Sequence, residues 1–295
     1  MRLTFLSVCM FALFLSSGVN AADFQLAPYK DKLFAYPRVI DKSSDGNYLL
    51  VEYDRERDLI GRDRIPRRKA HYRYVDQGVR WSRGVKTYQS ANGTKKLFAV
   101  GKQGRNTKIV VIYVHGKGGN RRQGVNDWTF GGNFNRLQNL MTRNKGLLLT
   151  PDFTNFKARG KQDIANLMFE AITANPNARI FIACGSMGGG VCWRLAKDTK
   201  TAKHIDGLFI LGSHWDNEFL TSPVLKSSKS AIPIYFGHGA ADPVFAPKTQ
   251  LAFFKNIKAK NKNYPARFVM FSTGAHGTPI RMIDWRRELN WMLRQ

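Results

Sequence analysis

The stretch that decides the fold is Ala183-Cys-Gly-Ser-Met-Gly-Gly-Gly190, in which one hydroxyl stands among four glycines. It follows directly on the apolar run Arg179-Ile-Phe-Ile-Ala183. Because glycine is costly to order, four of them around Ser186 indicate a backbone shape that side chains would obstruct. A strand that ends in small-x-Ser-x-Gly and opens into a helix is typical of a nucleophile elbow, a sharp turn that exposes the serine Oγ.

One feature departs from the usual motif, and a second supports the interpretation as an elbow. The first small position of the motif holds Cys184 rather than glycine, a departure that sterics tolerate. The helix that follows Ser186 begins at the turn, and a helix N-terminus favours negative charge that develops there. The alternative is a glycine-rich turn that binds phosphate or only packs a strand against a helix. Residues elsewhere in the chain must therefore decide between the two.

The pattern around this turn predicts an α/β fold with a doubly wound, mostly parallel sheet. The stretch 85–100 reads as two alternating runs joined at Asn92-Gly93, which favours an antiparallel N-terminal hairpin. Beyond it, continuous apolar runs alternate with amphipathic stretches, which indicates parallel strands covered by helices on both faces. The expected strands are 109–114, 146–149, 180–183, 208–211, 232–236 and 267–271, and the expected helices are 162–174, 187–197, 247–260 and 279–294.

Chemistry in such a sheet gathers in the loops beyond the carboxyl ends of the strands. Asp242 lies in the loop after 232–236, and His276 lies in the loop after 267–271. A serine nucleophile needs a base to take its proton and a carboxylate to orient that base. We therefore predict a triad of Ser186, Asp242 and His276, with Asp216, after the preceding strand, as the alternative acid.

A second glycine-rich loop, His115-Gly-Lys-Gly-Gly119, follows the run 109–114 and matches a loop that binds the developing oxyanion. We predict that the backbone N–H groups of Met187 and Lys117 are its donors. His115 is expected to shape this loop at the margin of the substrate pocket rather than to act as a base.

The connection between the runs 208–211 and 232–236 is too short for a large cap domain, so we expect an open pocket. Trp215 and Phe219 of this connection are candidates to line it. Arg121, beside Lys117, is a candidate to attract an anionic acyl group or an anionic headgroup. The alternative is that these basic side chains only point into water.

The sequence pattern predicts that the chain has three segments. Residues 1–21 have one positive charge, an apolar run and a small-residue cleavage pattern, which predicts a secretory signal peptide. Export through the Sec pathway would place the protein in a bacterial periplasm or outside the cell. Residues 22–84 read as a basic N-terminal extension with a partly ordered surface segment at 55–73, and residues 85–295 as the main domain. Cys184 and Cys192 are expected to be small buried residues, because a bridge would distort the turn between them.

The balance of charged residues indicates which classes of binding partner to expect. The chain has 47 Lys and Arg against 21 Asp and Glu, a formal charge of +26. Such a charge favours an anionic membrane or polysaccharide surface, unless it only solvates the exposed helix faces. Nucleic acid is not expected, since no recognised motif accompanies the charge and export makes that partner improbable. No metal site and no cofactor is predicted, and the oligomeric state is not indicated.

The motifs 113–119 (YVHGKGG), 183–190 (ACGSMGGG), 237–247 (GHGAADPVFAP) and 274–279 (GAHGTP) together resemble the α/β-hydrolase fold superfamily. The closest resemblance is to its lidless phospholipase/carboxylesterase and dienelactone-hydrolase-like branches, and it covers 85–295. Together with the predicted signal peptide, it implies a secreted serine hydrolase that cleaves carboxylic esters of small molecules, lipids or acylated envelope material through an acyl-enzyme. The alternatives are a serine peptidase with the same triad, and a non-catalytic protein whose basic face binds a polyanion.

Overall fold

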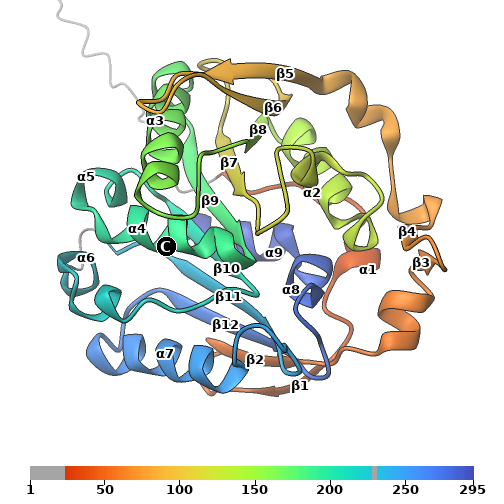
Figure 1. Ribbon diagram of the computed structural model, residues 1–295. Coiled ribbons are helices and arrows are strands. Elements are labelled where there is room, and N and C mark those ends of the chain that lie inside the picture. Colours follow the sequence, from red (N-terminus) through yellow and green to blue (C-terminus); the bar gives the residue numbers. More distant parts are fainter. Residues whose placement is uncertain (1–23, 228–230) are drawn as a thin grey trace, which may run out of the picture.

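The computed structural model describes residues 24–227 and 231–295, so the predicted signal peptide lies outside the described residues. The chain builds one large twisted sheet with helices on both faces (Figure 1). The strands are β1 (Val39–Lys42), β2 (Tyr48–Val51), β3 (Asp63–Arg64), β4 (Lys69–Ala70), β5 (Arg83–Tyr88), β6 (Lys95–Gly101), β7 (Ile109–Val114), β8 (Gly146–Pro151), β9 (Arg179–Gly185), β10 (Gly207–Leu211), β11 (Ile234–Gly239) and β12 (Ala266–Phe271).

The large sheet has the strand order β1-β2-β12-β11-β10-β9-β7-β8-β6-β5. The seven strands from β2 to β8 in this order run parallel, while β1 at one edge and β6 and β5 at the other are antiparallel to their neighbours. The predicted mostly parallel sheet with an antiparallel hairpin is thereby confirmed. The hairpin loop is longer than two residues, because Tyr88 pairs with Lys95.

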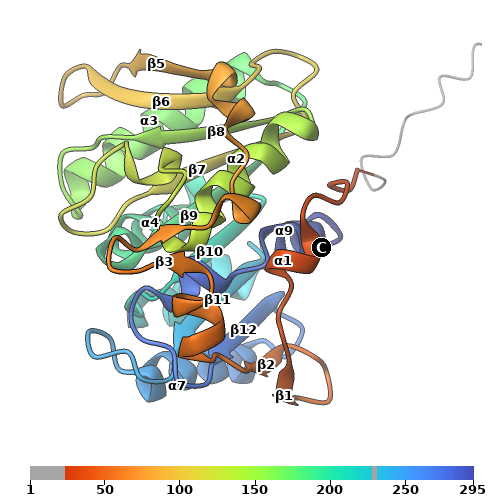
Figure 2. The same cartoon turned by 90° about the vertical axis from the view of Figure 1, so that its right-hand side faces the viewer.

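Two apolar cores lie on opposite faces of the sheet. One packs α3, α4 and α7 against it, and the other packs α2 and α9. Figure 2 shows the sheet between these two layers. The α-helices are α1 (Asp31–Phe34), α2 (Asn133–Arg143), α3 (Ala158–Ala174), α4 (Gly189–Lys197), α5 (Thr199–Ala202), α6 (Pro223–Lys226), α7 (Pro247–Lys260), α8 (Thr278–Met282) and α9 (Trp285–Leu293).

The C-terminal helix differs from its prediction. The apolar pattern of 279–294 predicts one helix, but the chain leaves helical geometry at Ile283 and forms α8 and α9. Asp284 caps α9 by accepting a hydrogen bond from the Arg287 N–H. Its carboxylate is also 2.9 Å from Nη1 of the buried Arg136, so a tertiary ion pair fixes the break.

The N-terminal segment is part of the same body. β2 pairs in parallel with β12 and, with β1, extends the sheet by two strands, so part of the predicted basic extension lies within the large sheet. The basic stretch 55–73 also differs from a partly ordered surface segment, since it forms a π-helix at Glu56–Ile60 and the β3–β4 pair. Arg62 and Asp63 are buried there.

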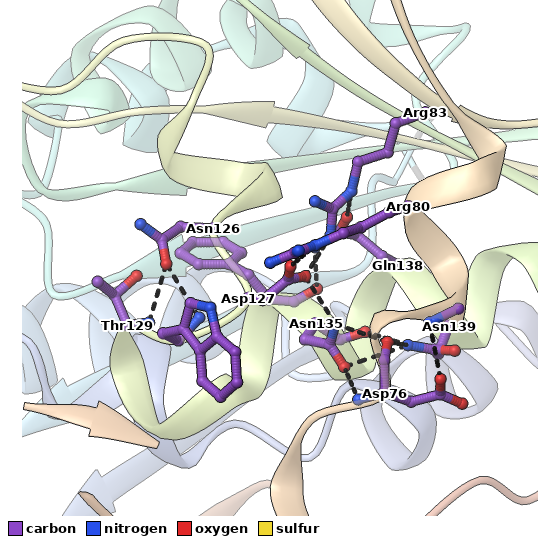
Figure 3. Close-up of polar contacts among 12 residues, drawn as sticks. Asp76, Arg80, Arg83, Asn126, Asp127, Thr129, Asn135, Gln138 and Asn139 are labelled. Carbon is purple, nitrogen blue, oxygen red and sulfur yellow. Dashed lines mark hydrogen bonds and ion pairs between the residues drawn. The ribbon is translucent and has the colours of Figure 1, made fainter. Parts of the chain in front are cut away.

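The segment covers a polar face of α2, a helix that the sequence pattern does not predict. In Figure 3 a buried network joins Asp127, in the loop between β7 and α2, to its partners. Asp127 is 3% exposed. Its carboxylate accepts hydrogen bonds from Arg80 Nε at 2.8 Å and from Asn135 Nδ2 at 2.7 Å, and it forms an ion pair with Arg83. The Asp76 N–H donates to Asn135 at 2.8 Å. The loop and the N-terminal segment are therefore fixed to α2.

No helix among residues 24–227 and 231–295 is both long enough and apolar enough to cross a bilayer.

Replacing Asp127 with Ala is expected to lower the free energy of unfolding by about 3 kcal/mol, because it removes the buried carboxylate that accepts hydrogen bonds from Arg80, Arg83 and Asn135. Urea unfolding followed by tryptophan fluorescence measures this change. Asp41→Ala is the matched control, because Asp41 is an exposed aspartate at the sheet edge. Equal stability of the two variants would show that the network does not hold the loop.

Candidate active site

Ser186 occupies a sharp turn between β9 and α4. A single 3-10 turn, Ser186–Gly188, connects the strand to the helix, and Ser186 has a φ of 51° in the left-handed region. That conformation strains a residue with a Cβ, by about 1–2 kcal/mol. The turn has the geometry of a nucleophile elbow, as the sequence predicts.

The surrounding glycines let three backbones meet at this turn. A Cβ on Gly188 would lie 2.6 Å from the carbonyl oxygen of Val114, at the end of β7. One on Gly116 would lie 2.8 Å from Cβ of Ser186, and one on Gly189 would overlap Oγ of Ser213. Larger residues at these places would push the serine away from the adjoining loops.

Cys184 and Cys192 form a disulfide, which corrects the expectation that they stay unpaired. The sharp elbow brings the end of β9 and the first turns of α4 together, with Cα atoms 6.3 Å apart, within the range that a disulfide spans. The bridge therefore connects strand and helix across the turn without distorting it. Both cysteines are fully buried.

The structure brings the three predicted triad residues together. Nε2 of His276 is 2.9 Å from Oγ of Ser186, and Nδ1 of His276 is 2.9 Å from Oδ2 of Asp242. Asp242 follows β11 and His276 follows β12, so each side chain comes from a loop at the carboxyl end of its strand. The arrangement holds an imidazole between a hydroxyl and a carboxylate.

Asp242 is held as a carboxylate. Burial alone would raise its pKa, but hydrogen bonds from His276 and from the N–H groups of Val244 and Phe245 outweigh burial and lower it below its ordinary value. The buried His238 lies beneath it, with Nε2 2.9 Å from the Phe245 carbonyl and 3.4 Å from Oδ2 of Asp242. Burial lowers the pKa of His238, so it stays neutral and adds no charge beside the triad.

The two oxyanion donors stay a prediction: Met187 directly follows Ser186, and Lys117 directly follows Gly116, which packs against Ser186. Within the described part of the chain, the Lys117 N–H donates to no backbone carbonyl. His115 is buried, with Nδ1 2.9 Å from the Gly116 carbonyl and its ring stacked on Phe153 at 4.5 Å. It thus shapes the loop, and burial lowers its pKa.

The aromatic residues around the triad differ in part from those the sequence suggests. Phe219 is fully buried against Trp193 and cannot line a pocket, and Trp215 packs partly buried against the same core. Phe245 lies beside the triad instead, with its ring centroid 5.7 Å from that of His276. Phe245 was not found from the sequence, because its neighbours give no periodic signal in that loop.

The remaining candidates have other partners. Asp216, the alternative acid, pairs with Lys197 at 2.7 Å and caps a 3-10 turn. Arg121 is anchored to Asp152 by its side chain and by its backbone N–H, so it supports the loop after β7. Lys117 is exposed, and its side chain remains free to face solvent.

Ser213 contacts the backbone of Ser186 and was not found from the sequence. Its Oγ donates to the carbonyl oxygen of Ser186 at 2.6 Å and comes from the loop directly after β10. A serine after the neighbouring strand was the available signal, but a lone hydroxyl there is too common to be informative. Among the described residues, no three His, Cys, Asp or Glu side chains cluster in a way that would hold a metal ion.

The sequence matches no protein-family model and no curated protein. Solved structures match the fold. One of them is an esterase of Pyrococcus furiosus, with TM-score 0.53 and 14% identity over 74% of this chain and 94% of the esterase. A protein of unknown function from Agrobacterium tumefaciens, described as an α/β hydrolase candidate, gives TM-score 0.54 and 15% identity over 70% and 93% of the two chains.

An acylaminoacyl peptidase of Pyrococcus horikoshii is a third neighbour, with TM-score 0.51 and 16% identity over 73% of this chain. The match spans only 41% of the peptidase. These likenesses establish that the chain has the α/β-hydrolase fold, as the motifs predict.

Gly188→Ala is expected to destabilise the protein by about 1–3 kcal/mol and to reduce any serine-dependent activity, because its methyl group would overlap the backbone of β7. Chemical denaturation measures the stability. Gly84→Ala is the matched control, since a Cβ there meets nothing within 4 Å. If the Gly188 variant were as stable as the control, the close packing at the elbow would not be needed.

Removing the disulfide with Cys184→Ala and Cys192→Ala together is expected to lower the free energy of unfolding by about 2 kcal/mol, because a cross-link over a separation of 8 residues no longer restricts the unfolded chain. Denaturation with and without dithiothreitol measures this. Reductant should destabilise the wild type and leave the double variant unchanged. Equal sensitivity of both proteins to reductant would contradict the bridge.

Proposed function

We propose that the protein is a serine hydrolase that cleaves carboxylic esters through an acyl-enzyme. The observation that carries the proposal is the hydrogen-bonded sequence of atoms from Ser186 Oγ through His276 to Asp242, with 2.9 Å at each step. The strained backbone at Ser186 also supports the proposal, as does the α/β-hydrolase fold, whose solved neighbours include esterases.

The geometry supplies each step of acyl transfer. Nδ1–H of His276 donates to Asp242, which leaves Nε2 free to accept the Ser186 proton as Oγ attacks the ester carbonyl. The imidazolium that forms is stabilised by the ionised Asp242. When the tetrahedral intermediate collapses, Nε2 returns the proton to the leaving alcohol, and a water activated by the same nitrogen then releases the acid from Ser186.

The developing negative charge would lie between the N–H groups of Met187 and Lys117. One such backbone donor contributes about 3 kcal/mol of barrier reduction in enzymes of this kind. Because Gly116 packs directly against Ser186, the loop that carries Lys117 is held next to the reacting carbon. The N-terminal end of α4 adds a favourable dipole at the same place.

An ester is the favoured substrate over a peptide. The described part of the connection between β10 and β11 holds a 3-10 turn at Asn217–Thr221 and α6, and the solved neighbours that include esterases support the choice of an ester. The peptidase neighbour makes peptide cleavage the second candidate. We further propose that the protein acts in the cell envelope or outside the cell, on the basis of the apolar, singly charged leader at residues 1–21.

The test compares 4-nitrophenyl esters of graded acyl length with peptide 4-nitroanilides of matched size. We expect short esters to be cleaved with a kcat/KM at least about 100-fold above that of the anilides. Ser186→Ala should abolish cleavage, and Asp242→Asn should lower kcat by about 10⁴-fold, because the imidazole loses its orienting carboxylate.

Asp216→Asn is the matched control for the acid, since Asp216 binds Lys197 rather than the imidazole. We expect it to leave kcat within about threefold of the wild type. Faster anilide cleavage would favour the peptidase. Ester cleavage that survives Ser186→Ala would overturn the proposal.

A further inference from the structure

A second feature adjoins the loop after β7, the loop that also carries Lys117. Between the β3–β4 pair and the loop after β7 there is a surface groove of about 410 Å³, within the size range of ligand pockets. It is lined by Arg64, Arg67, Lys69, Tyr72 and Trp128, besides Ile65 and Pro66. No carboxylate lines it.

The cations of the groove have no acidic partner. Within residues 24–227 and 231–295, the ion pairs of the protein include none from Arg64, Arg67 or Lys69. By contrast, Arg57, in the same basic segment, pairs with Asp58 and Glu52. Three uncompensated charges around one hollow attract an anionic ligand.

The aromatic residues of the groove add a second kind of contact. Tyr72 is 66% exposed and meets Trp128 edge-on, with ring centroids 5.3 Å apart. The Arg64 guanidinium lies 4.9 Å from the Tyr72 ring centroid, which holds it in place by a cation–π contact. Exposed aromatic rings cover the C–H faces of sugar rings, and guanidinium groups bind carboxylates through paired N–H donors.

Backbone and side-chain contacts link the groove to the loop after β7 and, through that loop, to the residue that follows His276. The Ala70 N–H donates to the Trp128 carbonyl at 2.9 Å, which joins β4 to the loop. Asp127, next to Trp128, is fixed by the buried network of Figure 3. Two residues further on, the Phe130 ring lies against Gly277, where a Cβ would be 3.3 Å from it. Gly277 directly follows His276.

We propose that this groove binds an acidic polysaccharide and presents acyl esters on that polymer to Ser186. The inference rests on the proposed function and names its substrate class. A concave site with three unpaired cations, the exposed Tyr72 ring and the half-buried Trp128 ring fits charged sugar units, whereas the aliphatic part of its lining consists of Ile65 and Pro66. The formal charge of +26 favours approach to such a polymer.

Binding is tested on the full chain carrying Ser186→Ala, which cannot turn over substrate, with polygalacturonate as the probe and tryptophan fluorescence as the signal. Changing Arg64, Arg67 and Lys69 to Gln should weaken binding about tenfold, because three ion pairs are lost. Tyr72→Ala should weaken it about fivefold. Neutral dextran should not bind.

The matched control changes Arg105, Lys203 and Lys262 to Gln. It removes the same charge from exposed positions just before the amino-terminal ends of β7, β10 and β12, whereas the triad lies beyond the carboxyl ends of the strands. We expect it to weaken binding less than about threefold. Equal losses for the two triple variants would overturn the proposal, because attraction would then be unspecific. Tighter binding of phosphatidylglycerol vesicles or oligothymidylate than of polygalacturonate would also overturn it.

A second measurement separates this inference from the proposed function. In the chain with Ser186 intact, the ratio of kcat/KM on acetylated polygalacturonate to that on 4-nitrophenyl acetate should fall about tenfold in the groove variant and stay constant in the control. Cleavage of 4-nitrophenyl acetate without polygalacturonate binding would remove the groove proposal alone. Binding without cleavage of any ester would remove the proposed function and leave the groove as a polysaccharide-binding site only.

Discussion

The structure depends on the close approach of three strand ends around Ser186. The left-handed backbone of this serine is held because the ends of β7 and β9 and the loop after β10 come within contact distance, with glycines at the points where a Cβ would overlap. Ser213 secures the Ser186 carbonyl from one side, and the disulfide joins β9 to α4 from the other. The strain at one residue is therefore balanced by packing and covalent restraint around it.

The N-terminal segment, residues 24–84, stabilises the helices beside the site through ion pairs. Its carboxylates pair with arginines of α2 and α8: Asp31 with Arg136, Asp76 with Arg143 and the buried Asp63 with Arg281. α8 begins two residues after His276, so the segment fixes the helix that follows the proposed base. Burial lowers the pKa of Arg62 to about 9, and its side chain stacks between Phe34 and Tyr74. Much of the basic segment thus serves structure, while Arg64, Arg67 and Lys69 remain unpaired at the surface.

The sequence could predict what local patterns encode. The strand runs, the helix at α7 and the order of Ser186, Asp242 and His276 follow from periodicity and from loops placed after strands, and the structure brings those three residues together. It could not predict α2, because the polar face of that helix is satisfied only by residues far away in the chain. The disulfide and the burial of Phe219 likewise depend on tertiary geometry, since neither spacing nor hydropathy tells which side of a turn a side chain faces.

The central claim is that Ser186 is an activated nucleophile, and reaction with a fluorophosphonate tests it most directly. Such a reagent traps a serine only where a base removes the proton and donors stabilise the tetrahedral oxygen. Peptide mapping after labelling of the folded protein should place one stoichiometric adduct on Ser186. An adduct confined to another residue, or no adduct on protein that unfolds cooperatively, would contradict the account.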